Sequence, residues 1–199
     1  MKIFALILIA AALALNLYIK LSRRKNKASP SRKSTLCAQV MCSGTHAFAR
    51  RKYSYDGIAD CKAASELYDG PKFCSYGCVG MGTCAAVCPE KAINIIGGVA
   101  AVDRSRCTGC GKCLSACPKG IIKLIPREKI CWVGCSSPAE AESTDAVCRV
   151  GCTACGDCVA VCPSGAVKIK DNLAVTDTSL CTGCGECRTA CTRKTIWKA

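Results

Sequence analysis

The chain has 199 residues, of which 22 are cysteine, and it carries a formal net charge of +14. This cysteine content indicates either a disulfide framework or metal centres, because Phe, Tyr and Trp make up only 5% of the residues and leave few large side chains for a core. Eight of the 28 basic residues precede Ser34 and no aromatic–basic interleaving accompanies the rest, which excludes nucleic-acid binding as the meaning of the charge.

Residues 1–20 are predicted to form a transmembrane helix. The segment is apolar from Ile3 to Ile19 except for Asn16. Seventeen helical residues rise about 26 Å, at the short end for spanning a bilayer. A cleaved signal peptide with Ala12-Leu13-Ala14 as its A-x-A site is the alternative, but the strongly basic run follows the apolar segment instead of preceding it.

Residues 21–36 are predicted to be a basic juxtamembrane linker, because they contain several lysines and arginines and no acid. Basic residues next to a membrane helix stay on the cytoplasmic side. We therefore expect a single-pass protein of the cell (inner) membrane with its soluble part in the cytoplasm. In that compartment cysteine is used less for disulfides than for metals or redox chemistry.

Residues 37–73 form a cysteine-containing preface to the rest of the chain. A short helix is expected around residues 59–68. The cysteines of the preface and the only histidine of the chain are Cys37, Cys42, Cys61 and His46.

The most informative pattern lies in residues 148–199, the predicted second module. It reads C-x2-C-x2-C-x3-C-P and then, with 18 residues between the fourth and fifth cysteines, C-x2-C-x2-C-x3-C. In this spacing each cysteine triplet wraps one [4Fe-4S] cube, and the cysteine after the x3 gap is a ligand of the other cube. Structural zinc, the alternative, prefers two separated cysteine pairs. The predicted ligands are Cys152, Cys155, Cys158 and Cys191 for cluster 3, and Cys162, Cys181, Cys184 and Cys187 for cluster 4.

A shift of 74 residues superimposes the same unit on residues 74–126, the predicted first module, without a gap. One position breaks the repeat, because Met81 stands where Cys155 stands and a thioether is a poor ligand for a cube. Cys74, four residues before Cys78, is the nearest replacement. The predicted ligands are Cys74, Cys78, Cys84 and Cys117 for cluster 1, and Cys88, Cys107, Cys110 and Cys113 for cluster 2.

Each module is expected to be a small α+β ferredoxin unit. Residues 92–96 and 99–102 flank Gly97-Gly98, and residues 167–170 and 173–176 flank Asp171-Asn172, so each pair predicts a β-hairpin. Short helices are expected to follow four of the cysteines, namely Cys88, Cys113, Cys162 and Cys187. The fold class predicted for the whole chain is α+β, with two tandem ferredoxin modules after one transmembrane helix.

Six cysteines are not needed by these four clusters: Cys37, Cys42, Cys61, Cys131, Cys135 and Cys148. Cys61 and Cys135 are related by the shift of 74, as are Cys74 and Cys148. One hypothesis is a fifth cluster held by Cys42, Cys61, Cys135 and Cys148, which would join the preface to residues 127–147, the connecting segment. The alternative is that these residues are free thiols or packing residues.

The chain resembles the B subunit of the Rnf electron transport complex in its long anaerobe form. The resemblance lies in the two modules and in five shorter stretches: residues 42–45, 53–61, 74–78, 82–84 and 135–137. The family's separate iron–sulfur domain, which normally precedes the region near Cys42, has no counterpart, since only about twenty residues separate Lys20 from Cys42. Thr192 instead of proline follows Cys191, and His46 stands where another cysteine is expected.

The resemblance implies a membrane-anchored electron-transfer subunit of an ion-translocating ferredoxin:NAD oxidoreductase. Soluble ferredoxin would be the electron donor, and other subunits of the complex and the lipid bilayer would be partners. We expect four [4Fe-4S] clusters or five, and no catalytic site in this chain, because one histidine and no dinucleotide-binding loop leave no substrate chemistry.

Two alternatives belong to other classes. A membrane-tethered polyferredoxin that donates to a hydrogenase, dehydrogenase or reductase would contain the same clusters. A disulfide-rich exported scaffold would contain no iron.

Overall fold

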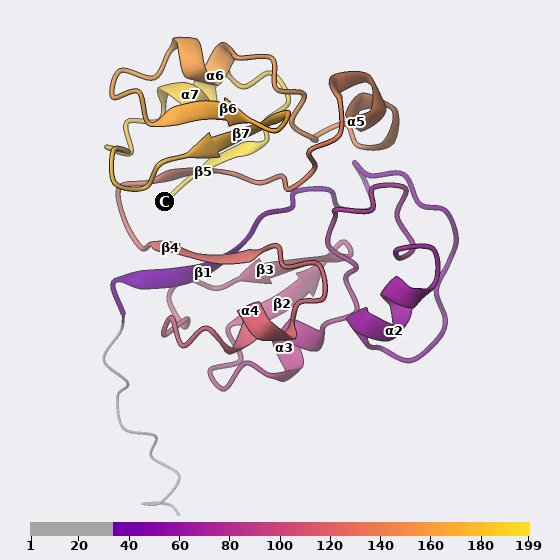
Figure 1. Ribbon diagram of the computed structural model, residues 1–199. Helices are drawn as coiled ribbons and strands as arrows, with labels where there is room; N and C mark the ends of the chain where they lie inside the picture. The colour runs from indigo at the N-terminus through magenta and orange to yellow at the C-terminus, as the bar shows by residue number, and fades with distance from the viewer. Residues whose placement is uncertain (1–33) are drawn as a thin grey trace, which may run out of the picture. The chain divides into compact units, whose positions relative to one another are not determined.

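The computed structural model describes residues 34–199 (Figure 1). The predicted transmembrane helix, residues 1–20, and the basic linker up to residue 33 lie outside these residues. Within residues 34–199 no helix combines the length and the apolar character that crossing a bilayer requires.

The first module begins with a four-residue helix and continues through a β-hairpin, a second helix and a final strand. These elements are α3 (Thr83–Ala86), β2 (Ile93–Ile96), β3 (Val99–Val102), α4 (Lys112–Ala116) and β4 (Ile122–Pro126). The hairpin prediction is confirmed: β2 and β3 pair antiparallel, and Gly97 and Gly98 in the turn have φ of +54° and +73°. Both central residues of such a two-residue turn need positive φ, which glycine adopts without strain.

The second module repeats this order, with every element beginning 74 residues later. Its elements are α6 (Asp157–Ala160), β6 (Val167–Lys170), β7 (Leu173–Thr176), α7 (Glu186–Ala190) and β8 (Ile196–Lys198). The predicted hairpin is again confirmed, and Asp171 and Asn172 adopt positive φ in its turn. The internal repeat read from the cysteines is therefore a repeat of the backbone.

The prediction that helices follow Cys88 and Cys162 is wrong. In both modules the helix comes earlier and carries the preceding cysteine of the same loop, Cys84 in α3 and Cys158 in α6. Cys88 and Cys162 each precede a proline, and the residue before proline is disfavoured in helical conformation. The helices expected after Cys113 and Cys187 are present as α4 and α7, each beginning one residue before its cysteine.

Two strands that were not predicted come from outside the modules. In the preface, β1 (Leu36–Val40) pairs antiparallel with β4, and in the connecting segment β5 (Cys131–Val133) pairs antiparallel with β8 (Figure 1). The last strand of each module thus gains a partner for its backbone N–H and C=O groups, which an isolated edge would leave unpaired. Each module is therefore completed by the segment that precedes it in the chain.

The preface and the connecting segment each contain one helix. The predicted preface helix is present but shorter, as α2 (Cys61–Glu66), and Asp60 caps it by accepting hydrogen bonds of 2.9 Å from the backbone N–H groups of Lys62 and Ala63. The connecting segment forms α5 (Ala141–Val147), which was not predicted and ends at Cys148.

The buried core contains thiols together with aliphatic side chains. In the first module Cys78, Cys84 and Cys113 are buried among residues such as Ile93 and Ile122, and in the second Cys158 and Cys187 are buried with Val167 and Ile196. Cysteines of each module therefore form part of its hydrophobic core.

Candidate iron–sulfur sites

Site 1 is a cavity in the first module that is walled by four thiols and by aliphatic side chains. Its thiols are Cys61, Cys78, Cys84 and Cys117. Burial, with the nearby thiols of Cys78, Cys61 and Cys117, raises the pKa of Cys84 to about 12. Four sulfurs in an apolar, water-poor space form the donor set that iron–sulfur clusters use.

The membership of site 1 differs from the set predicted for cluster 1, because the structure places Cys61 there instead of Cys74. The backbone N–H of Cys61 donates to the Thr83 hydroxyl at 2.7 Å, and that hydroxyl donates to Asp60 at 3.0 Å. These bonds hold the first turn of α2 against the start of α3, which carries Cys84. Met81 packs against the small cluster of apolar residues that contains Cys61. The thiol missing at position 81 is thus replaced by one from the preface.

Site 2, also in the first module, brings together the four thiols predicted for cluster 2: Cys88, Cys107, Cys110 and Cys113. Burial raises the pKa of Cys113 to about 11, and the thiols of Cys107, Cys110 and Cys88 add to the effect. The two loops exchange cysteines, because Cys88 of the first loop lies in site 2 while Cys117 of the second loop lies in site 1. Among these thiols Cys110 is exposed to solvent.

Sites 3 and 4 in the second module contain the sets predicted for clusters 3 and 4. Cys152, Cys155, Cys158 and Cys191 line one cavity. Burial raises the pKa of Cys187 to about 12, and the thiols of Cys131, Cys181 and Cys162 add to the effect. Cys181 and Cys184 in turn lie beside Cys131. Cys184, the last member of site 4, is exposed, as is Cys155 of site 3.

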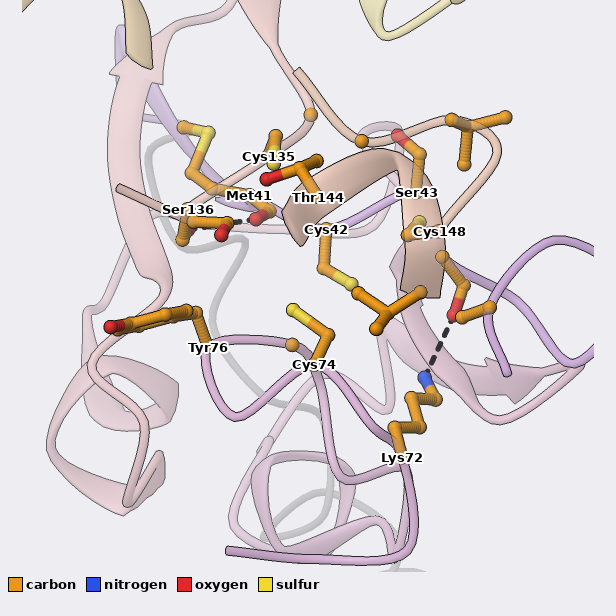
Figure 2. A pocket seen from close by; sticks show the side chains of 18 residues that line it. Met41, Cys42, Ser43, Lys72, Cys74, Tyr76, Cys135, Ser136, Thr144 and Cys148 are labelled. Atoms are coloured by element: carbon orange, nitrogen blue, oxygen red, sulfur yellow. Dashed lines mark hydrogen bonds between the residues drawn. The ribbon is translucent and has the colours of Figure 1, made fainter. Parts of the chain in front are cut away.

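A further cavity, here called the bridge site, lies where the preface meets the connecting segment. Its thiols are Cys42, Cys74, Cys135 and Cys148. Figure 2 shows the sulfurs of Cys42 and Cys74 directed toward one another inside it. The fifth cluster was predicted with Cys61 in place of Cys74, so the structure exchanges these two thiols between the two sites.

No spacing rule would have separated Cys61 from Cys74. Both precede the first module's cysteine triplet, and the shift of 74 residues treats them alike, since it relates one to Cys135 and the other to Cys148. The sequence does show Asp60 directly before Cys61 at the predicted start of a helix. That Asp60 accepts a hydrogen bond from Thr83, and so brings Cys61 to site 1, is recognisable only in the folded chain.

Three further residues lie outside the predicted groups of four, although two of them contact a thiol of such a group: Cys37, Cys131 and His46. Cys37 is fully buried beside Cys107, and burial raises its pKa to about 11. Cys131 is in the corresponding place in the second module, where its backbone N–H donates to the sulfur of Cys181 at 3.4 Å. His46 lies over Gly98, and burial together with Arg51 and Lys72 lowers its pKa.

The surroundings of the thiols suit cluster sulfur. Backbone N–H groups donate to cysteine sulfurs in both modules, from Ala92 to Cys88 at 3.4 Å and from Ala174 to Cys152 at 3.5 Å. Such bonds stabilise thiolates and tune the cluster potential. Within residues 34–199 no three His, Cys, Asp or Glu side chains converge closely enough for a single metal ion. A cube takes one thiolate on each of four irons, so its ligands surround a larger body.

Three family descriptions match the chain. The LdpA Fe-S cluster-binding domain matches residues 71–128, and 4Fe-4S dicluster domains match residues 106–166 and 151–196. The chain therefore contains 4Fe-4S dicluster ferredoxin domains of mixed helix and strand content.

Curated relatives agree with these domains. The B subunit of the proton-translocating ferredoxin:NAD(+) oxidoreductase complex of Clostridium ljungdahlii is 44% identical over 145 residues, which are 72% of this chain and 51% of the relative. The chain is a homologue of the B subunit of the Rnf complex. The B subunit of the Na(+)-translocating complex of Acetobacterium woodii is 40% identical over 100 residues, 49% of this chain and 30% of that protein. A third homologue, the B subunit of an ion-translocating oxidoreductase complex of Methanosarcina acetivorans, is 39% identical over 56 residues, 28% of this chain and 21% of that protein. The chain thus spans about half or less of the length of these relatives.

Proposed function

We propose that this chain is an electron-relay subunit of a membrane-bound, ion-translocating ferredoxin:NAD oxidoreductase of the Rnf type. The single observation that carries the proposal is the gathering of sixteen thiols into four groups of four, inside modules homologous to the B subunit of the Rnf complex. Bound [4Fe-4S] clusters would supply one-electron chemistry, each alternating between the 2+ and 1+ states.

The residues of each module support transfer between its two sites. Cys117 of the second loop lies in site 1, and Cys191 of the corresponding loop lies in site 3. In each module the adjacent site takes the last cysteine of the first loop, so the two sites share short lengths of backbone. The apolar side chains around them exclude water, and the backbone N–H groups that donate to sulfur stabilise negative charge.

The exposed thiols indicate where electrons would enter and leave. Cys110 of site 2, Cys155 of site 3 and Cys184 of site 4 are all exposed. A small redox protein such as soluble ferredoxin would approach one of these faces, and another subunit of the complex would cover another. We propose the cytoplasmic side of the inner membrane for this part of the chain, with residues 1–20 as the membrane anchor.

We propose four sets of ligands, which the proximity of their thiols supports: Cys61, Cys78, Cys84 and Cys117; Cys88, Cys107, Cys110 and Cys113; Cys152, Cys155, Cys158 and Cys191; and Cys162, Cys181, Cys184 and Cys187. The sequence contains no Gly-rich dinucleotide-binding loop, so we propose that NAD is reduced on another subunit.

The test is anaerobic purification of the full chain from its native membrane, followed by identification of the co-purifying subunits. The isolated complex is then mixed with chemically reduced ferredoxin and the bleaching of the cluster absorbance is followed. Ion-translocating membrane subunits and rapid bleaching are expected. Recovery with a hydrogenase, dehydrogenase or reductase and no such subunits would instead favour a tethered polyferredoxin, and a colourless, iron-free protein would exclude both.

A further inference from the structure

The bridge site draws its four thiols from segments on both sides of the first module. Cys42 follows β1, Cys74 precedes the first module's cysteine triplet, Cys135 follows β5, and Cys148 ends α5 (Figure 2). None of these cysteines belongs to sites 1–4, so the thiols of this cavity are not accounted for by the two modules.

Small residues keep the space between the sulfurs open. A Cβ added to Gly44 would lie 3.2 Å from the sulfur of Cys148 and 3.8 Å from that of Cys42. A Cβ added to Gly77 would lie 3.6 Å from the sulfur of Cys74 and 3.8 Å from that of Cys42. The sulfurs of Cys42, Cys74 and Cys148 therefore face the same space, and glycines form part of its wall.

Lys72 gives an independent indication that an anion belongs in this cavity. The residue is only 3% exposed, and its amine donates to the backbone oxygens of Gly44 and Gly98, each at 2.8 Å. Neither ion pair of the described residues includes it, and no aspartate or glutamate of the described chain lines the cavity. A buried ammonium without a counter-charge is strongly unfavourable, so an anion beside Lys72 would remove an otherwise uncompensated cost.

We propose that the bridge site holds a fifth [4Fe-4S] cluster, with Cys42, Cys74, Cys135 and Cys148 as its thiolate ligands and the Lys72 ammonium as its buried counter-cation. An oxidised cube with four thiolates carries a charge of about −2, which matches the sign that Lys72 requires. Burial raises the pKa of the Cys135 thiol to about 11, so binding of this thiol to iron would release its proton.

The bridge site touches one site in each module. The backbone N–H of Cys78, a member of site 1, donates to the sulfur of Cys42 at 3.4 Å. The backbone amide of Cys152, a member of site 3, faces the Cys135 thiol and lowers its pKa, against the larger effect of burial. One electron passing along this path oxidises a module cluster from 1+ to 2+ and reduces the bridge cluster from 2+ to 1+, with no proton or further reactant. The site is thus the electronic link between the two modules.

Lys72 would set the potential of this link. A fixed positive charge beside the cube stabilises the more negative, reduced state and raises its reduction potential. The bridge cluster's part in electron transfer rests on the function proposed above, but its presence does not.

Iron and sulfide analysis of the full chain, purified without oxygen, tests occupancy. We expect about 20 iron atoms per chain with the bridge cluster, and about 16 would mean that only sites 1–4 are filled. Cys135→Ser and Cys148→Ser should each lose about four irons, whereas Cys131→Ser, a buried cysteine of the same connecting segment outside the cavity, should lose none. Stoichiometric zinc in the wild-type chain, or equal iron in the wild type and both ligand variants, would overturn the proposal.

Redox-titrated electron paramagnetic resonance of Lys72 variants tests the counter-cation and does not depend on removing a ligand. In Lys72→Met, with the iron content kept, the reduced fraction of one cluster at fixed potential should fall at least about tenfold, which is 59 mV for a one-electron couple. Lys72→Arg should largely restore it, and Lys170→Met, an exposed lysine of β6, should leave all potentials unchanged. Unaltered potentials in Lys72→Met would overturn this role.

These outcomes are separate from those of the proposed function. A chain with about 16 irons that still accepts electrons from ferredoxin would refute the bridge cluster alone. A chain with about 20 irons that purifies with a catalytic reductase would refute the Rnf-type assignment alone.

Discussion

The two modules have the same order of backbone elements but differ in the origin of one thiol, which comes from the preface in the first module and from the module itself in the second. In the second module Cys155 lies in the same loop as Cys152 and Cys158, so site 3 is built entirely from the module's own cysteines. In the first module Met81 occupies that position, and Cys61 arrives from α2 in the preface. A self-contained site can form from local contacts, whereas site 1 needs the preface to fold first or together with it. The difference shows that one repeat can lose a cysteine while its cavity is still lined by four thiols, because a cysteine from another segment takes the vacant place.

Replacing Cys155 by methionine, the residue found at the equivalent position 81 of the first module, should have the largest effect on cluster content. Cys155→Met should abolish the cluster of site 3, because no thiol from α5 or its surroundings reaches that cavity as Cys61 reaches site 1. Iron should fall by about four per chain. The metal–thiolate bonds lost in this way also stabilise the fold, so the second module should be cut sooner in limited proteolysis. Unchanged iron would mean that three thiolates suffice and would weaken the case for Cys61 as a ligand.

A cysteine introduced at position 81 of the first module should make site 1 independent of Cys61. Cys61→Ser should lose the site 1 cluster, and Met81→Cys in the same chain should restore it by recreating the spacing of the second module. The measurement is iron and spin count in the single and double variants. Cys61→Ser combined with Cys135→Ser should lose about eight irons, because the two thiols belong to different sites. A loss of only about four in the double variant, with the same loss in each single variant, would place both thiols in one cluster, as the sequence predicts.

The contact that delivers Cys61 should matter less than the thiol itself. Thr83→Val removes the hydroxyl between Asp60 and the backbone of Cys61, so site 1 should bind its cluster more weakly and lose it faster to a chelator. Asp157→Asn, at the matching position of the second module, is the control and should not change the rate at site 1. Loss of iron at the same rate in both variants would mean that the network does not hold Cys61 in place.

Lowering the pH should weaken the hydrogen bond between Asp60 and Thr83, because the Asp60 carboxylate becomes protonated. The backbone N–H of Ala63 and the Thr83 hydroxyl lower the pKa of Asp60 below its ordinary value of 3.8. A carboxylate with a depressed folded-state pKa stabilises the fold above its unfolded pKa, and the contribution is lost as the pH falls through the lower folded value. As the pH falls below 3.8 and through the lower folded value, the wild type should therefore approach Asp60→Asn in chelator sensitivity, while the two should differ most at neutral pH. Parallel curves at all pH values would exclude the carboxylate as the cause.

Substitution of Cys37 or Cys131 should have the smallest effect on the clusters, and it compares equivalent places in the two modules. Each is buried beside the second site of its module but lies outside the group of four. Cys37→Ala and Cys131→Ala should keep all the iron, and a similar small shift in the potential of site 2 or site 4 is expected in each, because a thiol beside ligand sulfur has been removed. Loss of about four irons in either variant would make that cysteine a ligand.

Much of the architecture could be predicted from the residues alone. The shift of 74 residues, both hairpins with their Gly97-Gly98 and Asp171-Asn172 turns, and the helix after Asp60 all depend on local spacing and turn chemistry. Helix placement failed at Cys88 and Cys162, where the following proline disfavours helical conformation. The strands β1 and β5 were also missed, since pairing with β4 and β8 requires knowing which edges the modules leave open.

By itself, the order of cysteines determined that two ferredoxin modules exist and which thiols each loop contributes, because two- and three-residue gaps leave a thiolate little freedom. Which distant cysteine completes each group was decided only by tertiary structure. Cys61 and Cys74 are equivalent in the repeat, and the choice between them follows from the Asp60–Thr83 contact and from the way the preface folds against the first module. The entropic cost of closing a long loop depends only weakly on its length, so chain length does not decide which distant cysteine joins a site. Packing and hydrogen bonding decide it.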